Sequence, residues 1–165
     1  MAHPAQISIE ELLANCQTQR TRRSGPGGQH RNKVETAVVI EHRPTGMRAE
    51  ANERRSQEQN RQVAIHRLRT KLAVEIRTVP ADSPTSLWKS RIEGQRLKVS
   101  GSNADFPALL AEALDQIAAA DFDVAVMADK LQVSTSQLVK LLKIEPTALA
   151  WVNSMRASRG QAAYR

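Results

Sequence analysis

The stretch VPADSPTS, residues 79–86, divides the chain into two parts that are not expected to share one continuous fold. Its two prolines restrict the backbone and it offers few apolar side chains, which is typical of a linker. At 165 residues the chain is long enough for one ordinary domain or two small ones. We therefore expect two domains, residues 1–78 and residues 105–165, joined by a linker over residues 79–104. Within that linker, RLKVS is compatible with a short strand.

The first part has the pattern of an α+β domain, a small antiparallel sheet packed on a helix. The segments ETAVVIEH and GMRAEAN flank the turn RPTG, in which Pro44 fixes φ and Gly46 permits a positive φ. This arrangement predicts a β-hairpin over about residues 34–52. A helix is expected to follow, with Ser56 as its N-cap and a stripe of apolar side chains on one side. Nearer the start, SIEELL resembles a helix capped by Ser8.

The second part predicts a small all-α domain. Four helices are expected, at about 106–119, 124–131, 135–143 and from Pro146 to just before Gly160. Expected capping residues are Asp105, Asp123 and Ser134, the last forming a capping box with Gln137. The second and third helices together have the apolar spacing of a helix-turn-helix, although Gln132 stands where glycine is usual in the turn.

Positive charge is concentrated in the first part. The chain carries a net charge of +7, and residues 20–77 hold fourteen Lys and Arg against six Asp and Glu, while the rest holds ten against eleven. Most of these cations are arginines, which suit bidentate contacts with phosphate. Nucleic acid is therefore the leading partner. No apolar run approaches the roughly 20 residues of a transmembrane helix. The lone Cys16, expected to be a packing residue, fits a reducing compartment, so we expect a soluble cytoplasmic protein with no membrane partner.

The segment RSGPGGQHRNK, residues 23–33, carries the most specific chemistry. Glutamine is neutral, so Gln29 cannot act as an ordinary acid, base or nucleophile. Gly27 and Gly28 allow φ values closed to other residues, so the Gln29 N–H is free to point outward as a donor to a substrate oxygen. A phosphate cradle is the alternative, but the Gly-Lys-Ser/Thr ending of a P-loop is absent. The sequence shows no metal-ligand cluster, and no cofactor is expected.

Residues 23–72 resemble the catalytic domain of class I peptide chain release factors and of their stop-codon-independent ribosome-rescue relatives. The resemblance rests on an ordered series of motifs and extends plausibly over residues 7–78. The motifs are the Gly27-Gly28-Gln29 tripeptide after SGP, Asn32-Lys33, His42, PTG at 44–46, and RSQ at 55–57 with Asn60.

The resemblance implies an α+β domain that hydrolyses the ester bond of peptidyl-tRNA in the peptidyl transferase centre of the large ribosomal subunit. Gly27, Gly28 and Gln29 would be catalytic: the backbone N–H of Gln29 stabilises developing oxygen charge, and its side chain admits water. Gln29 is also the implied site of N-methylation by a glutamine methyltransferase. The chain is expected to act as a monomer and to contact ribosomal RNA through its basic stretch. The expected RNA contacts are Arg22, Arg23, His30, Arg31, Asn32, Lys33, Arg55, Gln57 and Arg61.

Two features depart from the family pattern. Nothing in the sequence resembles the family's codon-reading loop, and only 26 residues precede Gly27, so release is expected to be codon-independent. A helical domain with a short basic C-terminus, Arg156, Arg159 and Arg165, stands where rescue relatives carry a long basic tail. Two alternatives stay open: a catalytically silent ribosome-binding or assembly factor, and a helix-turn-helix DNA-binding regulator. The latter is disfavoured because residues 105–145 hold three Lys against seven Asp and Glu. A helical bundle used for packing, or for contacting ribosomal protein or RNA through Lys140 and Lys143, is the favoured interpretation of this part.

Overall fold

The computed structural model describes residues 2–22 and 36–165. The chain divides into two compact units. One, the sheet unit, comprises Ile7–Leu72, and the other, the helical unit, combines Met1–Gln6 with Ala73–Arg165. These two units meet between Leu72 and Ala73, and the domain end expected at residue 78 stays a prediction.

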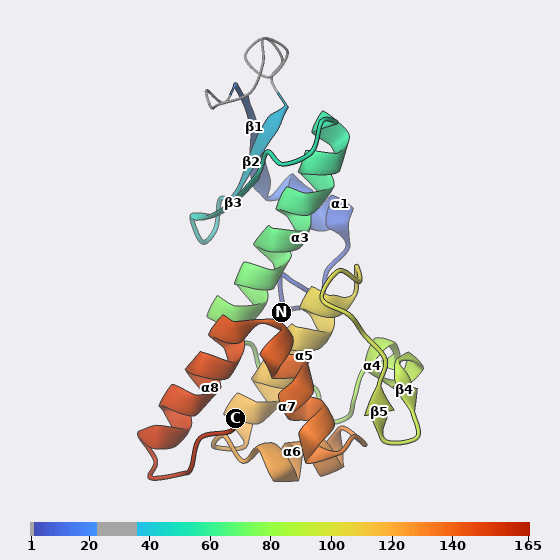
Figure 1. The fold of residues 1–165 in the computed structure, drawn as a ribbon, viewed down its shortest axis with the longest axis vertical. Helices are drawn as coiled ribbons and strands as arrows, with labels where there is room; N and C mark the ends of the chain where they lie inside the picture. Colours follow the sequence, from blue (N-terminus) through green and yellow to red (C-terminus); the bar gives the residue numbers. More distant parts are fainter. Residues whose placement is uncertain (1, 23–35) are drawn as a thin grey trace. The chain divides into compact units, whose positions relative to one another are not determined.

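The sheet unit contains a three-stranded antiparallel sheet in the order β1-β2-β3 (Figure 1). Strands β2 (Ala37–His42) and β3 (Met47–Ala51) form the predicted hairpin, and β1 (Cys16–Thr21) pairs with the other edge of β2. The small antiparallel sheet expected from the sequence is therefore confirmed. Strand β1 was not anticipated, because all its residues after Cys16 are exposed and lack an apolar alternation.

The turn between β2 and β3 is held by the side chains of its own motif. Gly46 has φ +69°, and its N–H donates to the His42 carbonyl at 2.8 Å. The His42 ring nitrogen Nδ1 lies 2.9 Å from the Thr45 hydroxyl. Arg43 donates from its guanidinium to the Cys16 carbonyl at 3.0 Å, which ties the turn to the start of β1. These residues of the HRPTG motif consequently hold the hairpin in shape.

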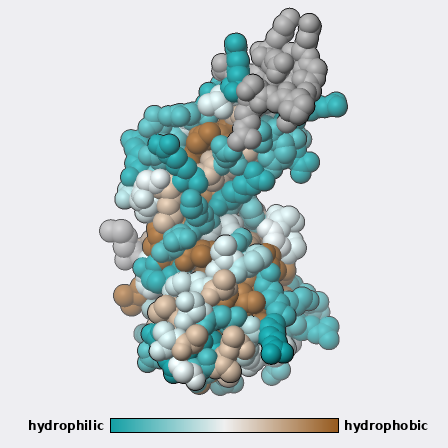
Figure 2. Space-filling model, turned by 60° about the vertical axis from the view of Figure 1, so that its left-hand side comes forward, coloured by the Kyte–Doolittle hydropathy of each residue, from teal (hydrophilic) through white to brown (hydrophobic). Residues whose placement is uncertain are grey.

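Two helices complete the sheet unit. Helix α1 (Ile9–Ala14) begins after Ser8, whose hydroxyl accepts the Glu11 N–H at 3.1 Å as expected of its cap. Helix α3 (Gln57–Glu75) begins after Ser56, which accepts the Gln59 N–H at 3.4 Å. Residues three and four positions apart lie on one side of a helix. Within this unit, the buried apolar side chains on that side of α3 are Ala64, Ile65, Leu68 and Leu72. The part of the sheet unit visible in Figure 2 is mostly hydrophilic at its surface.

The helices expected in residues 105–165, all of which are described, are present. They are α5 (Phe106–Ala119), α6 (Val124–Lys130), α7 (Thr135–Ile144) and α8 (Pro146–Ala157). Asp123 and Ser134 accept the backbone N–H groups of Val126 and Gln137, at 3.1 and 3.2 Å, as expected of N-caps. Asp105 precedes α5 without a side-chain cap bond, because its carboxylate pairs with Arg91 instead.

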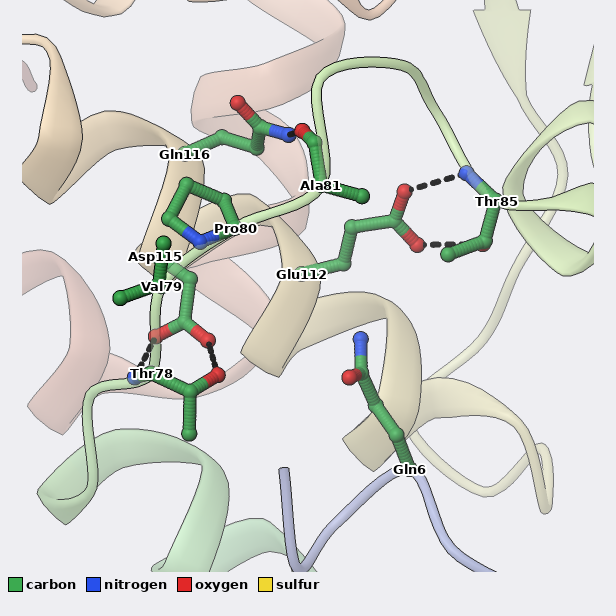
Figure 3. A pocket seen from close by; sticks show the side chains of 9 residues that line it. All are labelled: Gln6, Thr78, Val79, Pro80, Ala81, Thr85, Glu112, Asp115 and Gln116. Atoms are coloured by element: carbon green, nitrogen blue, oxygen red, sulfur yellow. Dashed lines mark hydrogen bonds between the residues drawn. The ribbon is translucent and has the colours of Figure 1, made fainter. Parts of the chain in front are cut away.

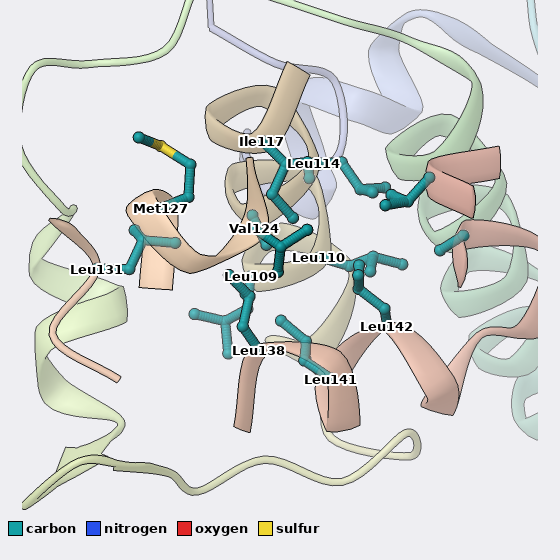
Figure 4. Packing of buried hydrophobic residues seen from close by; sticks show 14 of the residues in the cluster. Leu109, Leu110, Leu114, Ile117, Val124, Met127, Leu131, Leu138, Leu141 and Leu142 are labelled. Atoms are coloured by element: carbon teal, nitrogen blue, oxygen red, sulfur yellow. The ribbon is translucent and has the colours of Figure 1, made fainter. Parts of the chain in front are cut away.

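Helix α5 forms the centre of the helical unit. Every residue from Phe106 to Ile117 is buried, so this helix is enclosed on all sides. Leucines of α5 point toward those of α7, as Figure 4 shows for Leu109 and Leu110 beside Leu138 and Leu142. Leu109, Leu110, Leu114 and Ile117 are fully buried. A helix that is apolar on all sides is a buried helix. In this chain, which has few aromatic residues, the aliphatic side chains of α5 fill the core of the helical unit.

Residues 79–104 are structured, and the expected linker is a difference between sequence and structure. They contain α4 (Ser86–Ser90) and a hairpin of β4 (Ile92–Glu93) and β5 (Arg96–Leu97). Trp88 is fully buried, and its indole N–H donates to the Leu131 carbonyl at 2.8 Å. A buried tryptophan removes a large apolar area from water. Trp88 thus helps to anchor a segment that otherwise has the composition of a linker.

The short basic C-terminus folds back on the helical unit. The Arg156 guanidinium lies 4.4 Å from the centre of the Tyr164 ring and donates to the Ala162 carbonyl at 2.8 Å. Arg159 lies over the Phe122 ring at 4.6 Å. The Asn153 side chain bonds both the N–H and the carbonyl of Tyr164, each at 2.8 Å. Two of the three arginines counted as a basic tail are therefore used within the fold. Among the described residues, no helix combines the length and apolarity needed to cross a membrane.

Candidate functional site

The expected catalytic residues Gly27, Gly28 and Gln29 lie outside the described residues, as do Arg23, His30, Arg31, Asn32 and Lys33. The structure does describe where this segment leaves and rejoins the sheet. Thr21, the last residue of β1, faces Ala37, the first residue of β2, across the antiparallel ladder. The glycine-rich segment therefore joins two neighbouring strands, β1 and β2. The strand residues on either side of it, Thr21 and Ala37, are paired with each other.

Asn60 fixes one of those ends. Its side chain is fully buried, and its amide nitrogen donates to the carbonyls of Thr36 and Arg54 at 2.7 and 2.9 Å. Its amide oxygen accepts the Arg54 N–H at 2.9 Å. One side chain on α3 therefore satisfies three backbone groups from two separate segments. The sequence placed Asn60 in the family motif without giving it a role, and these bonds show that it anchors the segment next to β2.

A hollow of about 490 Å³ lies on the sheet unit between the sheet and the start of α3. It brings together Gln57 and Arg61, both expected from the sequence, with Arg20 of β1. Its remaining lining residues are Thr18, Val38 and Glu58. Arg20 was counted in the basic stretch but not identified as a site residue, because nothing in the sequence placed β1 beside α3. Its pairing with Val38 across the ladder is what brings it there.

The charges around this hollow favour an anion. Two guanidinium groups and the Gln57 amide supply N–H donors, and one carboxylate opposes them. That carboxylate, Glu58, lies 3.5 Å from the Arg61 guanidinium, and both side chains are well exposed. An exposed pair of this kind contributes at most about 1 kcal/mol, so Arg61 remains available to a stronger partner. Arginine with a neighbouring amide is a suitable set of donors for a phosphate group.

The two other expected RNA contacts that are described do not line this hollow. Arg22 and Arg55 are both exposed and are not among the residues of the hollow. His42 is buried beneath the β2–β3 turn, and burial lowers its pKa from the ordinary value. It is therefore neutral near pH 7 and serves the turn, not the hollow. Among residues 2–22 and 36–165, no group of three or more His, Cys, Asp or Glu side chains is arranged to hold a metal ion.

A second, smaller cavity lies in the helical unit and has a structural explanation. Its volume is about 60 Å³, and the segment 78–85 passes over it (Figure 3). Asp115 accepts from the N–H and hydroxyl of Thr78 at 3.1 and 2.5 Å, and Glu112 accepts from the same groups of Thr85 at 2.8 and 2.6 Å. The buried carboxylates thus fasten this segment to α5.

Comparison with known proteins places the sheet unit and the following segment in one family. The RF-1 domain model matches residues 5–102, so the chain belongs to the RF-1 domain family, the class I release factor domain that carries the Gly-Gly-Gln motif. The match includes Gly27–Gln29, the hollow, and the segment from Thr78 to the β4–β5 hairpin. Helices α5 to α8 lie beyond it.

Individual relatives agree with this assignment. The chain is 47% identical over 66 residues to "Peptide chain release factor 2" of Variovorax paradoxus, covering 40% of this chain and 18% of the relative. It is 42% identical over 94 residues to the chloroplastic "Peptide chain release factor PrfB1" of Arabidopsis thaliana, covering 52% and 21%. It is 38% identical over 86 residues to "Peptide chain release factor 1" of Acidiphilium cryptum, covering 52% and 24%. The matched segment therefore spans only about a fifth of the length of these relatives.

Proposed function

We propose that this chain hydrolyses the ester bond joining a nascent peptide to tRNA, within the peptidyl transferase centre of the ribosome. The observation that carries the proposal is the RF-1 domain match over residues 5–102, which includes an intact Gly27-Gly28-Gln29 tripeptide. The partners are the large-subunit ribosomal RNA and peptidyl-tRNA. Proximity to RNA also accounts for the concentration of arginine in residues 20–77.

In this proposal Gln29 acts through its backbone. As water attacks the ester carbonyl, negative charge develops on oxygen, and the Gln29 N–H donates a hydrogen bond to it. The side chain of Gln29 shapes the space that admits water and excludes larger nucleophiles. Gly27 and Gly28 allow the backbone conformation that presents the N–H. RNA supplies the remaining groups, and Gln29 is the proposed target of a glutamine methyltransferase.

The hollow on the sheet unit supports the part of this proposal in which the chain binds ribosomal RNA. Arg20 comes from β1, the strand that leads into the glycine-rich segment, and Gln57 and Arg61 come from α3. A phosphate held there would fix the sheet unit on RNA close to the point where that segment leaves the sheet. Binding affinity and reaction geometry would then be supplied by neighbouring parts of one surface.

The finer proposal is codon-independent release, as in ribosome rescue. It rests on the sequence, in which none of the 165 residues resembles the family's codon-reading loop. Recognition of the ribosome would then depend on RNA contacts instead of a codon. Codon independence can therefore be tested by changing the codon that the mRNA places in the A site.

The test is release of labelled peptide from ribosomes that hold peptidyl-tRNA on three messages: one truncated at the P site, one with a sense codon in the A site, and one with a stop codon. Gln29→Pro removes the N–H and is expected to lower the release rate by at least about 10²–10³-fold. Gln29→Ala keeps the N–H and is expected to retain some release with poorer nucleophile selectivity.

The outcomes separate the alternatives. Release that needs no stop codon and is lost in Gln29→Pro supports the proposal in full. Release only at the stop codon contradicts codon independence while leaving hydrolysis intact. Ribosome binding without release on any message favours a catalytically silent factor, and equal activity of the Pro and Ala variants contradicts the role of the backbone donor.

A further inference from the structure

Helices α6 and α7 form a helix-turn-helix closed by a well-bonded turn. The N–H groups of Gln132 and Val133 donate to the carbonyls of Asp129 and Ala128, both at 3.0 Å. Gln132 has φ +60°, the left-handed conformation that glycine usually supplies at this position. Ser134 then caps α7. The sequence left open what this motif contacts, and the surrounding residues address that question.

The β4–β5 hairpin lies against the N-terminal end of α7. The Ser134 N–H donates to the Gln95 carbonyl at 3.2 Å, and the Leu97 N–H donates to the side-chain oxygen of Gln137 at 3.3 Å. In DNA-binding helix-turn-helix proteins, the N-terminal residues of the second helix contact base edges in the major groove. Here that end contacts protein, and Gln137, the residue of α7 best suited to reading adenine, is already bonded. The arrangement weighs against the DNA-regulator alternative.

The solvent side of α7, in contrast to its N-terminal end, carries exposed polar and basic side chains. Ser136, Lys140 and Lys143 are exposed and stand four and three residues apart, so they share one side of the helix. Helix α7 contains no acidic residue. Among the described residues, the ion pairs of the helical unit involve Arg77, Arg91 and Lys98, and not these two lysines.

The acidic residues that make residues 105–145 negative overall are largely used inside the unit. Glu112 and Asp115 are buried and bond threonines of the segment 78–85. Asp105 pairs with Arg91, while Asp123 and Glu145 accept backbone N–H groups at the starts of α6 and α8. The remaining two are Asp121 and Asp129. The net charge of the segment therefore understates how positive the α7 surface is.

A further exposed cation, Arg96, lies on the β4–β5 hairpin, opposite Glu93 in its ladder. Arg96 is exposed and directly precedes Leu97, whose N–H bonds Gln137, so the backbone of Arg96 is fixed beside α7. We call the exposed Arg96, Ser136, Lys140 and Lys143 the α7 surface. Its cations come from two elements that hydrogen bonds hold together. A surface of this kind has the charge of a polyanion-binding site without depending on the sheet unit.

We propose that the α7 surface binds the phosphate backbone of structured RNA without reading its sequence. Lysines act as point charges toward phosphate, and the exposed stripe of α7 has no Arg, Asn or Gln with which to recognise a base in bidentate fashion. The major groove of A-form RNA is too deep and narrow for side chains to read, so proteins recognise such helices mostly through their shape, 2′-hydroxyls and phosphates. Of these, the phosphates are the groups that lysines suit. The inference concerns a second RNA contact, and it goes beyond the proposed hydrolysis.

The test uses the full chain, without ribosomes, and a fluorescent 12-base-pair RNA hairpin whose binding is followed by anisotropy over a range of salt concentrations. Each lysine that contacts a phosphate contributes about 0.7–0.9 to the slope of log affinity against log salt, equivalent to about 5- to 8-fold in affinity at 0.1 M salt. Lys140→Ala/Lys143→Ala is therefore expected to weaken binding about 25- to 60-fold and to lower the slope by about 1.5. Arg165→Ala removes one exposed charge of the same unit outside the α7 surface and serves as control.

Because the sheet unit also carries arginines, amide NMR spectra of the labelled full chain locate the contact. Shifts at α7 and β5 on adding the hairpin, lost in the double variant, support the proposal. Unchanged affinity and slope, or shifts confined to the sheet unit, overturn it and leave Lys143 as a stabiliser of the helix C-terminus. Tighter binding of a DNA duplex of equal length overturns the assignment to RNA. Peptide release is measured separately, so failure here is distinguishable from failure of the proposed hydrolysis.

Discussion

At the scale of single residues, Asn60 has the largest structural consequence for the candidate site. It is fully buried on α3 and completes three hydrogen bonds to Thr36 and Arg54. Asn60→Ala leaves these backbone groups without their partner, so we expect the free energy of unfolding to fall by about 2–4 kcal/mol. Urea denaturation followed by circular dichroism measures this loss.

Two further variants show whether the hydrogen bonds are responsible. Asn60→Asp has nearly the same shape but turns an oxygen toward two carbonyl oxygens, and it should be at least as destabilising as alanine. Gln59→Ala changes the neighbouring exposed side chain and should stay within about 0.5 kcal/mol of the original chain. A tolerated aspartate would mean that packing, and not hydrogen bonding, makes Asn60 important.

His3 makes the stability of the helical unit depend on pH. Both ring nitrogens are engaged: Nε2 lies 3.0 Å from the Ile76 carbonyl, and Nδ1 accepts the Ala5 N–H at 3.0 Å. The second bond requires a neutral ring. Burial lowers the pKa of His3, with Arg77 acting in the same direction while the Ile76 carbonyl and Asp115 oppose it.

Since the folded-state pKa of His3 lies below that of the unfolded chain, the stabilising contribution is fully present above about pH 6.5 and is lost as pH falls toward the folded value. We expect Tm to decrease between pH 7.5 and pH 5.5 more steeply in the original chain than in His3→Gln, which cannot titrate in this range. Differential scanning calorimetry at several pH values provides the comparison. Parallel curves for the two proteins would show that His3 makes no such contribution.

At the scale of elements, local signals in the sequence located helix ends well. Ser8, Asp123 and Ser134 cap helices as expected, because a cap depends on residues three positions apart. Strand β1 was not expected, and the segment 79–104 was expected to be a linker apart from RLKVS, part of which forms β5. Both structures depend on distant partners: β2 for the strand, and the Leu131 carbonyl for Trp88. The candidate site shows the same difference. Gln57 and Arg61 were expected as RNA contacts from the sequence, but Arg20 was not, because only the pairing of β1 with β2 brings it to the hollow.

The turn between α6 and α7 gives a prediction at this scale. Gln132 has a positive φ, which costs a residue with a Cβ roughly 1–2 kcal/mol, and no such cost applies to glycine. After allowance for the greater freedom of glycine in the unfolded chain, Gln132→Gly should stabilise the helical unit by about 0.5–1 kcal/mol. Gln132→Ala, which keeps the Cβ, should bring no such gain. Thermal unfolding of the two variants decides this, and an equal gain in both would point to the glutamine side chain instead of the backbone.

At the scale of the whole molecule, the two units divide the proposed tasks. The sheet unit holds the ends of the glycine-rich segment in a β ladder and carries the arginine-lined hollow. The helical unit has an aliphatic core, buried carboxylates that hold its own segments, and exposed cations on α7. The first unit would then provide the reaction and the second a separate contact with RNA.

This division predicts that release and RNA affinity can be changed separately in the full chain. In single-turnover release at saturating protein, Lys140→Ala/Lys143→Ala should keep the original rate, because neither lysine belongs to the unit that carries Gln29. The protein concentration for half-maximal release should rise at least about 5-fold, as expected for lost phosphate contacts. Gln29→Pro should show the reverse pattern, with release abolished and RNA-hairpin affinity unchanged.

Combining the changes tests whether the two contributions are independent. Hairpin affinity of the triple variant should match that of the lysine double variant, because distant sites without shared partners contribute additively. A fall in the saturating release rate of Lys140→Ala/Lys143→Ala would instead assign the lysines to the reaction step. An unchanged half-maximal concentration, in a variant that no longer binds the hairpin through α7, would show that the α7 surface meets an RNA other than the one on which release takes place.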